Sequence, residues 1–182
     1  MLGFQKHHQH AKKPRKEKRF TWSDRTYSRA AANGHLDVLM WLMLVGCPQD
    51  AEACLEAARG GHLEVLKWLR KVGWRWDTRA FSFAAEKGSF EVLKWLREEG
   101  CPMSPLATAY AARGDHLEVL KWLRKEGCPW SPLTYSVAAK RGNMEMLIWL
   151  KKEGCPMSPL ACEALKSGKS RAIGYREMVE PK

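Results

Sequence analysis

Six cysteines are the residues of this sequence best suited to metal binding, disulfide formation or nucleophilic chemistry. They lie at two positions of a repeat of 27 residues. Four occupy the first position, namely Cys47, Cys101, Cys128 and Cys155, and two occupy the second, namely Cys54 and Cys162. Zinc sites commonly use Cys-x-x-Cys pairs, and the sequence contains none. Cysteines that recur with a period are expected to be small buried side chains with a structural purpose. The sequence therefore predicts no metal site and reduced thiols, as in an intracellular protein.

Three histidines recur at one place in the same period. His35, His62 and His116 occupy it, and Ser89 and Asn143 replace histidine in the other two units. Serine and asparagine can replace histidine as a hydrogen-bonding cap of a helix, but they do not replace it as a metal ligand. We therefore expect the histidines to cap helices.

A short glycine-lysine-serine segment is a candidate for phosphate binding. Gly168-Lys169-Ser170 resembles the end of a phosphate-binding loop, but that motif needs a glycine five residues earlier, where the sequence has Glu163. The sequence shows no Ser/His/Asp set, no His-Glu-x-x-His motif and no carboxylate pair at a catalytic spacing. It therefore predicts a protein with no catalytic residues and no cofactor, which is not an enzyme.

The period of 27 residues predicts the architecture that positions all these side chains. The tryptophans of a Trp-Leu pair mark it five times, at Trp41, Trp68, Trp95, Trp122 and Trp149. A period of this size is typical of a solenoid, in which each unit buries its apolar face only against its neighbours. Short solenoids commonly present an extended surface to a partner rather than enclose a reaction.

Each unit is expected to contain two helices separated by a turn. A good N-capping residue begins every unit, namely Ser23, Asp50, Asp77, Ser104, Ser131 and Ser158. An alanine pair such as Ala138-Ala139 leaves room for a neighbouring helix, and a glycine such as Gly142 then supplies the turn. The predicted fold is an all-α helix-turn-helix solenoid of five repeats plus a partial C-terminal sixth. We expect a basic disordered leader at 1–20, the repeat domain at 21–165, and a degenerate cap and C-terminal tail at 166–182.

The repeats resemble a known family. Ala-Ala-Arg-Gly-Gly-His-Leu-Glu-Val-Leu-Lys-Trp-Leu at 57–69 resembles the Ala-Ala-x-x-Gly-His-x-Glu-Val-Val-x-Leu-Leu core of ankyrin repeats. Ser-Pro-Leu at 104–106, 131–133 and 158–160 resembles their Thr-Pro-Leu-His entry, and the resemblance covers about residues 22–165. It implies a non-catalytic scaffold that presents a concave helical surface to a protein partner. Ankyrin repeats have 33 residues, so these shorter repeats lack about six that form the family's β-hairpin finger.

The residues that differ most between repeats lie on the expected exposed side of the first helix and directly after its alanine pair. The family resemblance implies that this side is concave and binds ligands, and aromatic residues beside arginine are typical of interface hot spots. The candidate partner-binding residues are Arg29, Glu56, Arg59, Phe83, Glu86, Lys87, Tyr110, Arg113, Val137, Lys140 and Arg141.

The first repeat has apolar residues where the second has charged ones. Met40, Met43 and Leu44 replace two lysines and an arginine of the second repeat. A terminal repeat is expected to have a polar outer face, so an apolar one predicts a cover and a second interface. The cover could be the leader folding back through Phe4 or Phe20, a second copy of the chain, or another partner. The chain is expected to be a monomer or a weak homodimer through the first repeat.

The net charge of +11 is concentrated before the repeats. Residues 1–20 contain seven Lys or Arg residues and one Glu, whereas residues 21–162 contain nineteen basic and sixteen acidic residues. The basic run of the leader consists of Lys12, Lys13, Arg15, Lys16, Lys18 and Arg19. It could be a nuclear-targeting signal, could contact nucleic-acid phosphates, or could be a solvated leader with neither role. The alternative function is thus a nucleic-acid-associated or nuclear factor, whose leader contacts phosphates while the repeats recruit a protein.

No segment of the sequence predicts insertion into a membrane. The longest apolar run, Val38 to Val45, is far shorter than the ~20 residues that span a bilayer, and no secretory signal is present. The sequence therefore predicts an intracellular protein of the cytoplasm, the nucleus or both.

Overall fold

The computed structural model describes residue 23 and residues 25–159. These residues form ten helices and no strand. The helices are α1 (Thr26–Ala32), α2 (Leu36–Leu44), α3 (Ala53–Gly60), α4 (Leu63–Lys71), α5 (Thr78–Lys87), α6 (Phe90–Glu98), α7 (Leu106–Arg113), α8 (Leu117–Lys125), α9 (Thr134–Arg141) and α10 (Met144–Lys152). The predicted leader at 1–20 with its basic run, the predicted cap and tail at 166–182, and Cys162 lie outside the described residues.

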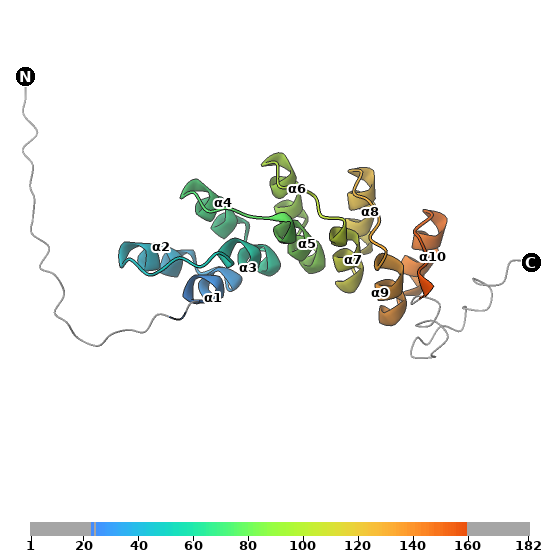
Figure 1. Ribbon diagram of the computed structural model, residues 1–182, viewed down its shortest axis with the longest axis horizontal. Coiled ribbons are helices and arrows are strands. Elements are labelled where there is room, and N and C mark those ends of the chain that lie inside the picture. The colour runs from blue at the N-terminus through green and yellow to red at the C-terminus, as the bar shows by residue number, and fades with distance from the viewer. Residues whose placement is uncertain (1–22, 24, 160–182) are drawn as a thin grey trace, which may run out of the picture.

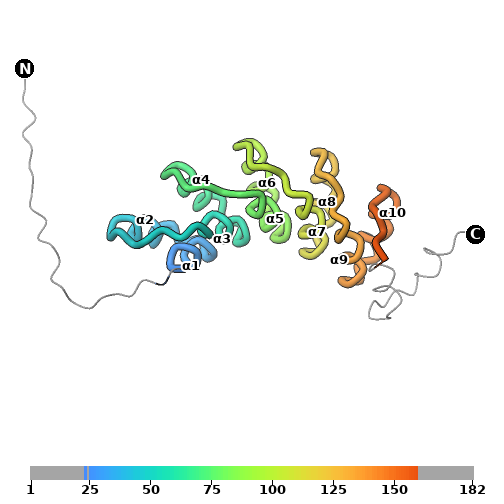
Figure 2. The backbone as a smooth tube through the Cα atoms, viewed as in Figure 1, coloured from blue at the N-terminus to red at the C-terminus, as the bar shows by residue number. Residues whose placement is uncertain are grey.

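The helices form five pairs that stack in chain order (Figure 1). The first helices pack directly on one another, α1 on α3, α3 on α5, α5 on α7 and α7 on α9, and each second helix packs on the first helix of its own pair. In Figure 1 the pairs follow a shallow arch, with the first helices along its inner edge and the second helices along its outer edge. Figure 2 shows that the connections between pairs cross the same side of the array. The predicted all-α repeat fold is confirmed.

Small residues allow the first helices to approach one another closely. Ala57 and Ala58 of α3 are fully buried, as are the equivalent alanines of α5, α7 and α9. The second helix of each repeat contributes larger side chains, such as Leu66 and Leu69 of α4, which are also fully buried. Together they form one continuous apolar core along the array, as expected for a solenoid.

The first helices begin later than the capping pattern predicts. Ser104 and Ser131 do cap, because each hydroxyl oxygen accepts a hydrogen bond from the backbone N–H two residues on, at 3.2 and 3.3 Å. However, the N–H of Thr134 donates to the carbonyl oxygen of Ser131 at 3.0 Å, which closes a 3₁₀-type first turn ahead of α9. Among the five described first helices, only α5 begins directly after its predicted cap, because Asp77 immediately precedes it and accepts a hydrogen bond from the N–H of Arg79.

The prediction that the histidines cap their helices is wrong. The side chains of His35, His62 and His116 make no capping hydrogen bond, whereas Asn143 caps α10 through its side-chain oxygen. The Nε2 atom of His62 instead lies 2.9 Å from the carbonyl oxygen of Ala32, in the preceding repeat. This histidine therefore links two neighbouring repeats.

Glycines provide the space that the histidine rings occupy. A Cβ atom added to Gly34 would lie 2.6 Å from the His62 ring, and one added to Gly88 would lie 2.7 Å from the His116 ring. Both glycines belong to the repeat before the histidine and have positive φ angles, +73° and +78°. They therefore serve both the turn and the contact between repeats.

We expect Gly114→Ala to lower the free energy of unfolding by about 1–3 kcal/mol, although this exchange normally stabilises a helix. Gly114 has a φ of −77°, so alanine would not strain the backbone there. Its Cβ would, however, lie 2.6 Å from Cδ2 of His116 and collide with the backbone carbonyl of Glu86. Denaturant unfolding measures the loss. In the third repeat, Lys87 and Ser89 stand at the positions of Gly114 and His116, so a side chain is accommodated there when the histidine is absent. Adding His116→Ser to Gly114→Ala should therefore recover part of the stability. A Gly114→Ala chain as stable as the parent would contradict this packing.

Candidate functional site

The candidate partner-binding residues all belong to the first helices, and each is exposed or partly exposed. One row takes a residue from each first helix in turn: Arg29, Glu56, Phe83, Tyr110 and Val137. A second row lies one helical turn later or at the helix end: Arg59, Glu86, Lys87, Arg113, Lys140 and Arg141. We call these eleven residues the first-helix strip.

Aromatic rings and arginines of the strip contact one another in the middle of the array. The rings of Phe83 and Tyr110 meet edge to face, with centroids 5.6 Å apart. The guanidinium of Arg59 lies 4.1 Å from the Phe83 centroid, and that of Arg113 lies 4.6 Å from the Tyr110 centroid. Arg113 of α7 also forms an ion pair, at 2.7 Å, with Glu86 of α5 in the preceding repeat. These contacts fix the side chains before any partner binds, which lowers the entropy lost on binding.

The strip is wider than the sequence analysis proposed. Leu106 and Leu133 are 45% and 46% exposed and lie four residues before Tyr110 and Val137. Residues four apart on a helix share a face, so both leucines extend the strip. The sequence contains this signal in the spacing of four residues between each leucine and the strip residue that follows it. Over α7 and α9 the strip therefore has an apolar row, formed by these leucines with Tyr110 and Val137, beside its basic residues.

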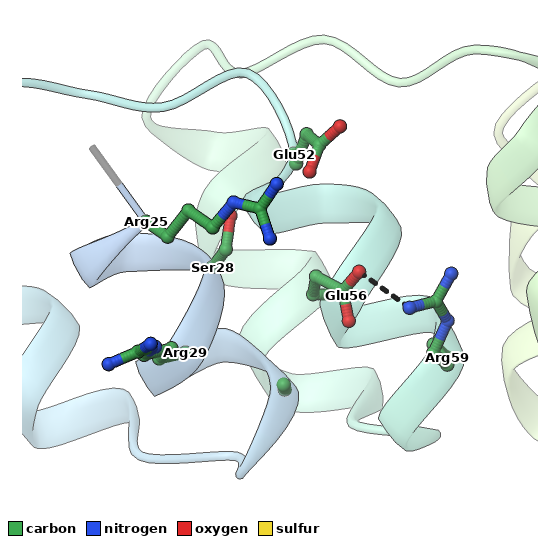
Figure 3. A pocket seen from close by; sticks show the side chains of 7 residues that line it. Arg25, Ser28, Arg29, Glu52, Glu56 and Arg59 are labelled. Atoms are coloured by element: carbon green, nitrogen blue, oxygen red, sulfur yellow. Dashed lines mark hydrogen bonds and ion pairs between the residues drawn. The ribbon is translucent and has the colours of Figure 1, made fainter. Parts of the chain in front are cut away.

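The strip is charged over α1 and α3, where it contains a hollow of about 240 Å³ (Figure 3). The hollow is lined by Arg25, Ser28, Arg29, Ala32, Glu52, Glu56 and Arg59. Arg59 pairs with Glu56 at 2.9 Å, and the Arg25 side chain extends toward Glu52 (Figure 3). Arg25 and Arg29 form no ion pair with any described residue. Both arginines line the hollow.

The proposed second interface lies on α2. Met40, Met43 and Leu44 are 47%, 44% and 86% exposed. Three further residues, which the sequence did not assign to this interface, are also exposed, namely Val38, Trp41 and Val45. We call these six residues the apolar face of α2.

The five described cysteines are free thiols and buried, as the sequence predicts. Burial raises the pKa of Cys54 and Cys101 to about 12, and that of Cys128 and Cys155 to about 11. Burial also raises the pKa of the Cys47 thiol. Thiols with such pKa values are protonated at neutral pH, so they are poor nucleophiles and poor metal ligands.

We expect these five thiols to react slowly with iodoacetamide at pH 8 in the native chain. With a pKa of about 11, only about a thousandth of a thiol is ionised at that pH. Labelling followed by peptide mapping should show rapid modification only in denaturant.

The raised pKa values also predict that the stability contributed by the neutral thiols is present at neutral pH and is lost as the pH rises above about 9. Rapid native labelling of Cys101 or Cys128 would contradict the burial.

The described residues show no cluster of three or more His, Cys, Asp or Glu side chains that could hold a metal ion. In the same part of the chain, no helix is long and apolar enough to cross a membrane.

Comparison with known proteins identifies the repeats. Residues 54–97, from the first turn of α3 into the last turn of α6, match the family model described as ankyrin repeats (many copies). No curated protein matches the chain. The match shows that residues 54–97 are ankyrin repeats, and the helix pairs on both sides of them have the same architecture.

Proposed function

We propose that the chain is a non-catalytic scaffold that binds a protein partner on the first-helix strip. Ankyrin repeats generally mediate protein–protein interactions. The observation that carries the assignment to this strip is the pair of arginine–aromatic contacts, Arg59 on Phe83 and Arg113 on Tyr110, beside exposed leucines. Aromatic and arginine side chains held in place before binding are typical of interface hot spots. The scaffold acts inside the cell, in the cytoplasm, the nucleus or both.

The charges of the strip favour an acidic partner segment with an apolar side chain. The strip contains six basic and two acidic residues, and both acidic residues already pair with arginines. Lys87, Lys140 and Arg141 border the apolar part and form no ion pair with a described residue. Complementary charge speeds association and selects the partner, while the apolar part supplies most of the affinity.

Reversing two charges with Arg113→Glu and Lys140→Glu is expected to weaken partner binding by about tenfold or more. The change removes two positive charges beside the apolar part and also breaks the pair between Arg113 and Glu86. Calorimetry at two salt concentrations measures the effect, and the difference between chains should shrink as salt rises. The control reverses Lys71 and Lys94, which lie exposed on second helices. An equal loss in both chains would mean that binding depends on net charge and not on the strip.

A nuclease-treated affinity capture tests the function itself, by comparing the full chain with one that begins at Phe20. A protein captured equally by both chains, and lost from the full chain carrying Phe83→Ala and Tyr110→Ala, supports a scaffold that binds through the repeats. Capture that needs the leader and disappears with nuclease would instead support the alternative of a nucleic-acid-associated factor. The leader residues on which that alternative depends lie outside the described part of the chain.

A further inference from the structure

The strip residues of α7 and α9 are ordered along each helix, with apolar side chains first and basic ones at the end. Leu106 and Tyr110 share one side of α7, and Arg113 follows on the same side as the last residue of the helix. The same order recurs one period later at α9, in Leu133, Val137 and Lys140, with Arg141 as the last residue. Both helices therefore present an apolar part and a basic C-terminal end.

The two helices form one surface, because α7 packs directly on α9. Leu106 and Leu133 are 45% and 46% exposed, and Tyr110 and Val137 are partly exposed. As equivalent helices of stacked repeats, α7 and α9 run in the same direction. Their apolar side chains therefore lie in two neighbouring rows, and their basic side chains gather at one end of both rows.

The width of this surface favours a helix as its occupant. Packed helices have axes about 8–10 Å apart, so the two rows are separated by about that distance. A helix with its side chains is about 10–12 Å across and reaches both rows at once. An extended chain is only about 5 Å wide in its own plane and covers one row.

The charges favour one direction for such a helix. Lys140 and Arg141 are exposed and form no ion pair with a described residue, and they lie at the C-terminal end of α9. A partner helix antiparallel to α7 and α9 has its N-terminus at this end. Acidic side chains in its first turn are stabilised by its own helix dipole and also meet the basic side chains. A parallel helix would align its dipole with those of α7 and α9, which is unfavourable.

We propose that the protein partner binds over α7 and α9 through an amphipathic helix that runs antiparallel to both. Its acidic first turn lies at Lys140 and Arg141. Its following turns place apolar side chains, three or four residues apart, on the two rows. The inference rests on the proposed function and specifies the segment of the partner that the first-helix strip binds.

The test is the selection of binders to the full chain from a library of random peptides of about 16 residues, or roughly four helical turns. We expect the selected peptides to have acidic residues first, then apolar residues at a spacing of three or four, with no proline after the first turn. Circular dichroism should show that they gain helix on binding. Exchanging both leucines, with Leu106→Lys and Leu133→Lys, should weaken their binding by about tenfold or more.

Both leucines are exposed, so the double variant should fold, and its own circular dichroism verifies this. The matched control is Ile148→Lys, which places the same charge at an exposed apolar position of α10 and should leave the affinity unchanged.

The direction of the helix is tested by crosslinking. A selected peptide with an amine-reactive group at its N-terminus should crosslink to Lys140, and the same peptide with that group at its C-terminus should not. Lys140→Arg keeps the charge, so it should keep the affinity and lose the crosslink. A crosslink to Lys140 from the C-terminus alone would overturn the antiparallel direction.

The failure of this inference is distinguishable from the failure of the proposed function. Selected peptides that need both leucines but contain proline in the middle, or gain no helix, would overturn the helical partner and leave the strip as a binding surface. Peptides that bind the double leucine variant as tightly as the parent would count against both. A library that yields no binding peptide would also overturn the inference.

Discussion

Replacing Phe83 and Tyr110 together with alanine is expected to weaken binding of the protein partner by about 3 kcal/mol, or roughly 150-fold. The two rings meet at 5.6 Å in the middle of the array and support the guanidinium groups of Arg59 and Arg113. Losing the rings therefore removes apolar contact area and also releases both arginines from their fixed positions. The dissociation constant for the captured partner, measured by calorimetry, gives the effect.

Both rings are partly exposed, so their loss should cost the fold little compared with the loss of binding. The matched control is Ile148→Ala, which removes an exposed apolar side chain from a second helix and should leave the affinity unchanged. If the double variant unfolds like the parent and binds with the parent's affinity, the strip is not the binding surface.

Phe81→Ala is expected to cause the largest loss of stability, about 3–5 kcal/mol. Phe81 is fully buried in α5, and its ring stacks on Trp122 of the next repeat, with centroids 6.3 Å apart and planes 14° apart. The exchange leaves a cavity between the third and fourth repeats. A repeat array is held together only by contacts between neighbours, so this cavity weakens the coupling of its two halves.

The weakened coupling should be visible in denaturant unfolding. We expect the single transition of the parent to broaden or split in Phe81→Ala, because the repeats on either side no longer unfold together. Phe81→Leu keeps most of the side-chain volume and should cost less than about 1.5 kcal/mol. A loss below about 1 kcal/mol in Phe81→Ala, with one sharp transition, would contradict the tight contact between these repeats.

The period of the sequence was sufficient to predict the architecture. Tryptophans, cysteines and alanine pairs recur every 27 residues, and a solenoid satisfies such recurrence because each unit meets the same surroundings. Buried alanines such as Ala57 and Ala58 follow directly from this reasoning, as do the buried thiols. Local regularity and contacts between neighbours together determine almost the whole described fold.

Contacts that cross from one repeat to the next were harder to predict. The sequence suggests that His62 caps its own helix, but the ring reaches the carbonyl oxygen of Ala32 at 2.9 Å. The direction of a side chain between two repeats depends on their relative placement, which no local pattern gives. A usable signal was nevertheless present: a glycine stands two residues before both His62 and His116, but not before Ser89.

The candidate site was predicted in part. Variation between repeats drew attention to Phe83 and Tyr110, and the structure brings their rings together. Leu106 and Leu133 were not predicted as part of the strip. Each stands at the start of a helix, and whether its side chain shares the face of Tyr110 or Val137 depends on where that helix begins. The 3₁₀-type turn before α9 sets that start and could not be predicted from the capping residue alone.

The most direct measurement of the central claim is hydroxyl-radical footprinting of the full chain with and without its captured partner. Binding on the first-helix strip predicts that labelling of Phe83, Leu106 and Tyr110 falls on complex formation. Labelling of Ile148, on the outer layer of the array, should stay the same. Protection of Ile148 with unchanged labelling of Phe83 and Tyr110 would contradict the account, because the partner would then lie on the second helices.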